Sequence, residues 1–215
     1  NNEKNSIWIG MARETAHQLG TPLSALIGWK EWLLENPEKV KEILPEMESD
    51  LDRLSQIGRR FSNMGSTPEF EMLNLSHRII SVVEYLKKRL PTLGKKVNLK
   101  NTIDPDINIK ANGSLLAWSI ENIIRNSIDA INQENGEVKV SLKKDQKIII
   151  RIEDNGYGIP KRDWRNIFRP GFSTKKAGWG LGLSLSKRII QDIHGGKLYV
   201  LKSNINEGTV IQIIL

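Results

Sequence analysis

The sequence predicts an α+β protein: a two-helix hairpin that dimerises into a four-helix bundle, followed by an α/β sandwich. In the first sixty positions apolar residues recur in steps of three and four, which is the spacing of helices packed in a bundle. The turn-forming run Gly65-Ser66-Thr67-Pro68 ends that pattern. Beyond it, apolar runs alternate with amphipathic stretches, as in a layered domain of strands and helices. We therefore expect a hairpin at 1–66, a linker at 67–72 and a second domain at 73–215.

The hairpin is expected to consist of two long helices. The first runs from about Ser6 to Glu35, and Asn36-Pro37 then breaks the helical pattern. The second takes Pro45 in its first turn, where a missing backbone N–H is tolerated. The apolar seams are formed by Ile9, Ala12, Ala16, Leu19, Leu23, Leu26 and Leu33, and by Leu44, Met47, Leu51, Leu54, Gly58 and Phe61. Because one hairpin buries only one face of each helix, we expect a homodimer.

The second domain is expected to form one sheet covered on one face by helices. Its helices are predicted at Ser76–Leu90, Ser114–Asn132 and Gly180–His194. Its strands are predicted at Val97–Asn101, Ile107–Lys110, Val138–Leu142 and Lys147–Glu153, with a closing hairpin of Lys197–Lys202 and Thr209–Leu215.

Composition narrows the classes of partner. The net charge is +7, but lysine and arginine are spread through the chain with no DNA-reading motif beside them, so we expect no nucleic-acid partner. The chain has no cysteine, which excludes a disulfide framework and cysteine chemistry. No apolar run approaches the ~20 residues that span a bilayer. We expect a cytoplasmic fragment that makes no membrane contact itself, with any sensor or anchor upstream of it.

The run Ala16-His17-Gln18-Leu19-Gly20-Thr21-Pro22-Leu23 holds a candidate reacting group. His17 lies one step off the apolar seam, so the helix would hold its imidazole on the rim, exposed and well oriented. The alternative is a surface histidine without chemistry.

Two further candidates lie in the second domain. Asn122 and Asn126 are four residues apart and share a helix face, where two amide oxygens can hold Mg²⁺ together with phosphates and waters. Asp154 follows a strand and opens the loop Asp154-Asn155-Gly156-Tyr157-Gly158, where its carboxylate could accept from an amino-purine. The alternatives are a polar helix surface and an ordinary strand-to-turn Asp-Asn-Gly.

A possible lid and a glycine-rich turn follow. The run from Phe168 to Lys176 combines two aromatics with hydroxyls and cations, and its turn-forming residues predict an irregular, mobile lid. The run Gly178-Trp179-Gly180-Leu181-Gly182 leads into a helix, whose free N–H groups favour phosphate. It is neither a dinucleotide fingerprint nor a Walker loop.

Taken together and in this order, these motifs resemble the histidine kinases of two-component systems, whose catalytic domain shares the ATP-binding fold of gyrase, Hsp90 and MutL. The resemblance implies that His17 is the phosphoacceptor, that Asn122 and Asn126 serve Mg²⁺ and phosphate, and that Asp154 binds the adenine amino group. It implies that Lys175 and the amides of Gly178–Gly182 bind the triphosphate. The remaining ATP-binding positions it implies are Gly156, Gly158, Phe168, Phe172, Thr174, Gly180, Leu181 and Gly182.

The implied function is MgATP-dependent phosphorylation of His17, at Nε2, followed by transfer to an aspartate of a response regulator receiver domain. Thr21 is expected to orient a water for the reverse, phosphatase, reaction. The chain departs from the family pattern at Gln18, where an acid is usual, at Gly20, where an arginine is usual, and at Asp129, where a lysine is common. Gln18 can orient the Nδ1–H of His17 but cannot take a proton.

Two rival functions remain open. One is a gyrase- or MutL-like ATPase, although the position of the glutamate base in those enzymes is Asn122 here. The other is a dimeric scaffold that binds nucleotide without transferring phosphate, which the departure at Gln18 favours.

Overall fold

A computed structural model describes residues 19–20, 22–65, 69–91, 96–174 and 180–215. The chain divides into two compact units, Asn1–Thr67 and Pro68–Leu215. We describe each unit by itself. In the described part of the chain, no helix is both long and apolar enough to cross a bilayer.

The first unit is helical. Residues 22–35 form a helix that ends at Glu35, as predicted, while the predicted start at Ser6 lies outside the described residues. Asn36 interrupts the helix, and its Nδ2 donates to the carbonyl oxygen of Trp32 (2.9 Å). The 3₁₀ turn η1 (Pro37–Lys39) then leads directly into α2 (Val40–Gly65).

The predicted place of Pro45 is wrong. Pro45 lies inside α2 rather than in its first turn. The proline that opens the helical segment is Pro37, at the start of η1, where its missing N–H costs nothing. Pro45 therefore removes one hydrogen bond from the interior of α2.

The second unit is built on a five-stranded sheet. In spatial order its strands are β2 (Val97–Ile103), β4 (Gly136–Lys144), β5 (Ile148–Asp154), β7 (Gly208–Ile214) and β6 (Lys197–Asn204). β2 runs parallel to β4, and the other neighbours are antiparallel. The predicted closing hairpin is confirmed as β6 and β7.

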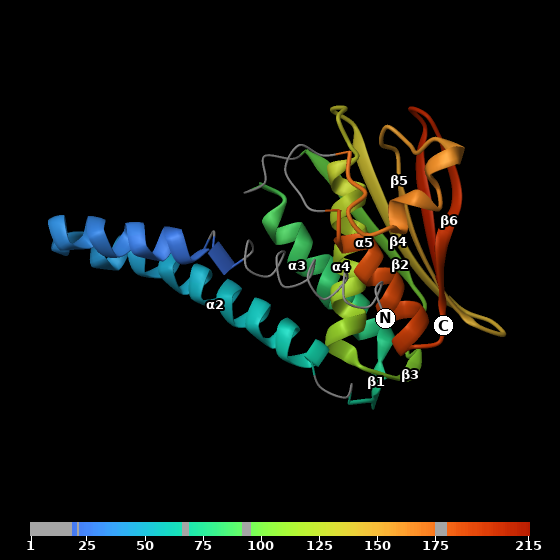
Figure 1. Ribbon diagram of the computed structural model, residues 1–215, viewed down its shortest axis with the longest axis horizontal. Helices are drawn as coiled ribbons and strands as arrows, with labels where there is room; N and C mark the ends of the chain where they lie inside the picture. Colours follow the sequence, from blue (N-terminus) through green and yellow to red (C-terminus); the bar gives the residue numbers. More distant parts are fainter. Residues whose placement is uncertain (1–18, 21, 66–68, 92–95, 175–179) are drawn as a thin grey trace. The chain divides into compact units, whose positions relative to one another are not determined.

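Three helices cover one face of this sheet (Figure 1): α3 (Leu75–Arg89), α4 (Gly113–Asp129) and α5 (Gly182–Arg188), which continues as the π-helical turn η5 (Ile189–Ile193). Asn74 and Asn112 cap α3 and α4 by accepting from the backbone N–H groups of His77 and Leu115, both at 2.9 Å. The strands turn alternate apolar residues into the core beneath the helices, among them Val138, Val140 and Leu142. The predicted sandwich with helices on one face is confirmed.

Two details of the predicted second domain are wrong. The segment 67–72 is not wholly a linker, because β1 (Glu71–Asn74) starts within it and pairs antiparallel with β3 (Asn108–Ala111). These two strands make a second, small sheet, so the unit has two sheets rather than one. In addition, α4 ends at Asp129, three residues before the predicted end at Asn132.

Candidate functional site

The two asparagines of α4 meet the start of α5. Asn122 and Asn126 are four residues apart and share one face of α4, and the Nδ2 of Asn126 donates to the backbone carbonyl oxygen of Asn122 (2.8 Å). The Nδ2 of Asn122 is buried and has no hydrogen-bond partner among the described residues. The backbone of Gly182 lies against this amide, since a Cβ on Gly182 would be 3.7 Å from Asn122 Oδ1. A buried donor without a partner is costly in a folded protein, which makes this a position for an acceptor such as a phosphate oxygen.

The donor set also fits Mg²⁺ held jointly with phosphates. The described residues contain no group of three or more His, Asp and Glu side chains that could hold a metal by themselves. Magnesium often takes only one or two protein oxygens and completes its octahedron with phosphates and water. An asparagine amide that turns about its Cβ–Cγ bond presents either Oδ1 to a cation or Nδ2 to a phosphate. Asn122 and Asn126 can therefore serve either partner.

Asp154 lies at the end of β5 with 6 % of its surface exposed. Its Oδ1 accepts from the N–H groups of Gly156 (3.0 Å) and Thr209 (3.2 Å). Neither of these bonds uses Oδ2. Burial raises the pKa of Asp154, and the donors Gly156, Ser127 and Thr209 offset part of that rise. Oδ2 is thus the carboxyl atom suited to accept from a ligand such as an amino-purine.

The glycines after Asp154 allow close backbone contacts. A Cβ on Gly156 would be 2.5 Å from the carbonyl oxygen of Ala130, just past α4. Gly158 has φ +73°, and a Cβ there would be 2.0 Å from the carbonyl oxygen of Asn204. Only glycine fits either place. The Asp154 loop is therefore fixed to the end of the helix that carries Asn122 and Asn126.

The predicted lid is anchored at its start, within the described residues 168–174. Phe168 lies in the 3₁₀ turn η4 (Asn166–Phe168) and is buried in the core, with Lys187 Nζ 5.6 Å from its ring centroid. The prediction that Phe168 belongs to an irregular mobile segment is therefore wrong. Phe172 also packs against the core. The N–H of Gly171 donates to the carbonyl oxygen of Gly180 (3.2 Å), which joins the described part of this segment to the turn before α5.

The remaining predicted residues divide into two groups. Thr174 is exposed, and Leu181 is buried immediately before α5. The others lie outside the described residues: His17, Gln18, Thr21, Lys175 and Gly178. In the structure Asn122 lies against Gly182, and Asp154 accepts from the N–H of Gly156. Both pairs of residues lie next to α4 or its C-terminal end.

Sequence reasoning missed Thr209 and Ser127, which both act on Asp154. Thr209 is the register partner of Asp154 across β5 and β7, and its neighbour Gly208 would place a Cβ 1.9 Å from the Asp154 carbonyl oxygen. Ser127 Oγ is buried and has no well-aligned hydrogen bond to a described residue, although its hydroxyl lowers the pKa of Asp154. Strand pairing brings Thr209 to this place, so no local pattern identifies it.

His194 has both ring nitrogens engaged. Its Nε2 accepts from the N–H of Asn112 (3.2 Å), so Nδ1 carries the proton and donates to the carbonyl oxygen of Ile189 (2.8 Å). The ring also packs on Phe70, with centroids 5.3 Å apart. Burial lowers the pKa of His194. This histidine is a structural connection between η5 and the cap of α4, and it has no free nitrogen to act as a nucleophile.

Comparisons with known protein families match both parts of the chain. Residues 112–215 match the "Histidine kinase-, DNA gyrase B-, and HSP90-like ATPase" family, and residues 9–66 match the "His Kinase A (phospho-acceptor) domain" family. Sporulation kinase D of Bacillus subtilis is 28% identical over 211 residues, which cover 95% of this chain and 41% of that protein. The chain spans about half the length of the curated relatives it matches.

Solved structures show the same folds. The catalytic domain of histidine kinase ThkA aligns with a TM-score of 0.61 and 28% identity, covering 68% of this chain and 97% of that domain. Histidine kinase ThkA in complex with response regulator protein TrrA aligns over 100% of this chain and 63% of that one, with a TM-score of 0.62. At 24% identity the second likeness concerns the fold alone.

Proposed function

The chain belongs to the sensor histidine kinases of two-component systems, and from that premise we propose that it phosphorylates itself on His17 and passes the phosphoryl group to a response regulator. In the first step Nε2 of His17 bonds to the γ-phosphorus of ATP, the bond from that phosphorus to the β–γ bridging oxygen breaks, and ADP leaves. The Nδ1 proton passes to solvent, because Gln18 cannot accept it. In the second step the P–N bond breaks and an aspartate oxygen of the receiver domain bonds to phosphorus.

One observation carries the nucleotide part of this proposal: α4 borders both an anion-binding and an amine-binding place. The buried Nδ2 of Asn122, in the middle of α4 and without a partner among the described residues, lies against Gly182, and the Asp154 loop contacts Ala130 just past the C-terminal end of the helix. An adenine nucleotide has the matching polarity, with phosphates at one end and an amino group at the other. Mg²⁺, held with the phosphates by Asn122 and Asn126, would supply charge neutralisation, and catalysis would rest on positioning.

The exposed apolar side chains of the first unit support a homodimer. Leu23, Leu44 and Leu51 belong to the predicted seams, yet 51%, 48% and 53% of their surfaces are exposed. Ile27 and Leu34 are exposed at 50% and 74%. A second hairpin packed on these side chains would complete a four-helix bundle.

The partner and the second activity follow from the family. Histidine kinase ThkA, whose structure was solved with a response regulator, has the same fold as this chain. We propose a receiver domain as the partner here, with Thr21 orienting water in a phosphatase reaction. We propose the cytoplasm as the place of action, because ATP is supplied there.

The test is incubation of the purified chain with ATP labelled at the γ-phosphate. We expect label on the protein that is labile to acid and stable to base, as a phosphoramidate is. Release of labelled phosphate without labelled protein would instead indicate a gyrase- or MutL-like ATPase. Nucleotide binding with neither product would indicate a scaffold.

A further inference from the structure

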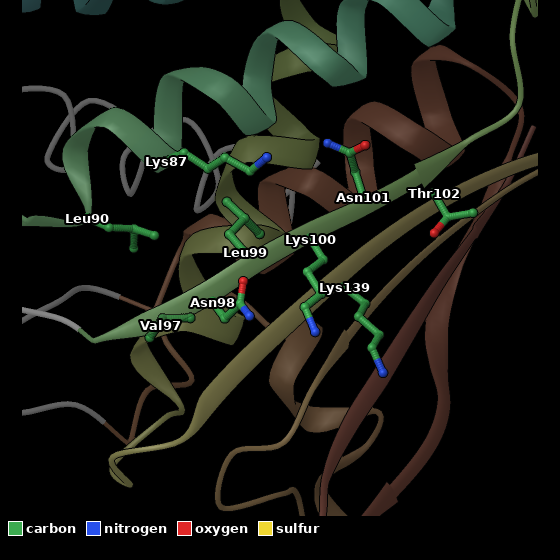
Figure 2. Close-up of a pocket in the computed structure, with 9 residues that line it drawn as sticks. All are labelled: Lys87, Leu90, Val97, Asn98, Leu99, Lys100, Asn101, Thr102 and Lys139. Atoms are coloured by element: carbon green, nitrogen blue, oxygen red, sulfur yellow. The ribbon is translucent and has the colours of Figure 1, made fainter.

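Beyond the kinase reaction, we propose that the free edge of β2 is a docking site for an extended, acidic segment of a partner protein, which adds to the sheet as a further strand. The site is the groove between the end of α3 and β2, and Figure 2 shows its lining. It has a volume of about 630 Å³ and is lined by Lys87, Leu90, Lys139 and residues 97–102. It continues into a second groove of about 670 Å³ that shares four of these residues: Lys87, Leu90, Val97 and Asn98.

The outer edge of β2 carries a row of backbone N–H and C=O groups, of which those of Leu99 belong to a residue that is only 4% exposed. Among the described strands β2 pairs only with β4, and it stands first in the sheet. Directly after β2, the N–H of Asp104 donates to the carbonyl oxygen of Leu142 on β4 (3.0 Å). Because successive residues of a strand direct their backbone groups to opposite sides, the even-numbered residues of β2 face β4. The N–H and C=O groups of Val97, Leu99, Asn101 and Ile103 therefore face outward.

This alternation selects a protein strand as the occupant. The outward row supplies one carbonyl acceptor for every N–H donor, two residues apart along the edge. A peptide backbone matches that pattern and a nucleic-acid phosphate backbone does not, because phosphates bring only acceptors. Addition of an extended peptide to an exposed sheet edge is a known mode of recognition in which backbone bonds give affinity and side-chain contacts give specificity.

The two sides of the groove select the side chains of the occupant. Leu99 and Leu90 are nearly buried beneath α3, and the half-buried Val97 supplies the accessible apolar surface on that side of the groove. Lys100 and Lys139 are register partners on the opposite face of the sheet, about half exposed. Figure 2 shows Leu99 on the α3 side of the strand and these two lysines on the other. An added strand would place apolar side chains on the side of Val97 and the intervening side chains beside the two lysines.

The charge near the edge is positive. Lys100 and Lys139 both pair with Glu137, whose pKa they lower to about 2, so two cations share one permanent anion. Lys96 adds a further cation to the adjoining groove, and Glu134 a further anion. Lys87 pairs with Glu84 (2.8 Å). The four lysines around the edge favour an acidic occupant, and they disfavour a second copy of β2, whose own Lys100 would add another positive charge beside them.

The direct test uses the chain 1–215 labelled with ¹⁵N and a capped peptide of alternating glutamate and valine with the length of β2, seven residues. We expect the peptide to slow hydrogen exchange of the amides of Val97, Leu99, Asn101 and Ile103, and to leave the free edge of β6 unchanged. Matched probes of alternating lysine and valine, and of alternating glutamate and proline, should not protect these amides, because one has the wrong charge and the other lacks alternate N–H groups.

Two variants test the two parts of the recognition separately. Asn101→Pro removes one outward N–H and leaves the bonds to β4, so it should weaken peptide binding about fivefold, as the loss of one hydrogen bond would. Lys100→Gln should also weaken binding and make it less dependent on salt, and it stays informative if the proline variant folds poorly. Lys197→Gln, on the opposite edge strand β6, is the matched control and should bind the peptide as the parent does.

Several outcomes would overturn the proposal. They are equal binding of all three peptides, protection of β6 rather than β2, and full affinity in Asn101→Pro. Protection of the β2 amides that rises with protein concentration alone would indicate a second copy. Protection by oligothymidylate in place of the peptide would indicate nucleic acid.

Discussion

At the scale of single residues, the two carboxylate oxygens of Asp154 have different roles. Oδ1 bonds to the protein backbone, and Oδ2 is proposed to accept from the ligand. Both backbone donors bond to the same oxygen, Oδ1, and an asparagine keeps that acceptor. The substitution replaces the other oxygen by an NH₂ group, which faces an adenine amino group as donor against donor. Asparagine is uncharged, so the substitution also removes the cost of burying a carboxylate, the same burial that raises the pKa of Asp154.

Asp154→Asn should therefore weaken ATP binding about 10–100-fold, since a hydrogen bond to a charged group contributes about 1.5–3 kcal/mol. It should reduce the preference for ATP over GTP and leave thermal stability undiminished. Calorimetric titration with both nucleotides and a melting curve would check this. Unchanged ATP affinity in the folded variant would remove Asp154 from the site.

His194 makes stability depend on pH. Its pKa is lowered in the folded state by burial, so the unfolded chain binds a proton that the folded chain does not. Stability should be fully present above the ordinary histidine pKa of about 6.5 and should fall as the pH drops below it. Protonation of Nε2 would also break its bond to the Asn112 N–H.

His194→Gln should flatten the fall of unfolding free energy between pH 6.5 and 5 by up to about 1.4 kcal/mol per pH unit, as expected for one proton. Denaturant unfolding at several pH values measures this slope. His77→Gln is the matched control, because His77 is exposed on α3, and it should keep the parent slope. An equal slope in His194→Gln and the parent would contradict this interpretation.

Gln18 tests how the acceptor histidine is oriented. If the amide fixes which nitrogen of His17 faces ATP, Gln18→Ala should slow self-phosphorylation more than Gln18→Glu accelerates it. The gain from glutamate should stay well below the ~10²–10⁴-fold typical of general base catalysis, because the nucleophilic nitrogen already has a free lone pair. Single-turnover rates at saturating MgATP compare the three proteins. An alanine variant as fast as the parent would falsify this role.

At the scale of elements, Gly156 in the loop after β5 and Gly182 at the start of α5 differ in the space available for an added Cβ. A Cβ on Gly156 would collide with the Ala130 backbone at 2.5 Å, whereas one on Gly182 would meet Asn122 at an ordinary 3.7 Å. Gly156→Ala should therefore destabilise the second unit by about 1–3 kcal/mol. Gly182→Ala should leave stability unchanged or raise it, because alanine favours helix.

Thermal melts of the two variants provide the comparison, and each serves as the control for the other. A larger loss in Gly182→Ala than in Gly156→Ala would contradict the contacts described for both loops.

The elements also show what the sequence could predict. The predicted starts of α3, α4, β6 and β7 each lie within one residue of the observed starts. β1 was missed because Leu73 is its only buried residue and its pairing with β3 is long-range. Pro45 was misplaced because Pro37 had already opened the helix.

The site residues also divide into those that a local pattern identifies and those that only long-range packing reveals. Asn122, Asn126 and Asp154 are identified by short local motifs, and the structure places them around one helix. Thr209 reaches Asp154 only through the pairing of β5 with β7, which no local pattern encodes. The turn-forming residues after Phe168 predict a mobile segment, but tertiary packing holds Phe168 in the core.

At the scale of the whole molecule, the proposed reaction is divided between two compact units. The proposed acceptor His17 belongs to the first, and the nucleotide residues Asn122, Asn126 and Asp154 belong to the second. A substitution in one unit should leave binding in the other unchanged when the sites share no contacts.

The most direct measurement is therefore a paired assay of His17→Gln and the parent: uptake of acid-labile label from γ-labelled ATP, and calorimetric affinity for ATP. We expect the variant to take up no label and to bind ATP with the affinity of the parent. Acid-labile label retained in the variant would contradict the assignment of His17 as the acceptor, and lost ATP affinity would contradict the division of the reaction between the two units.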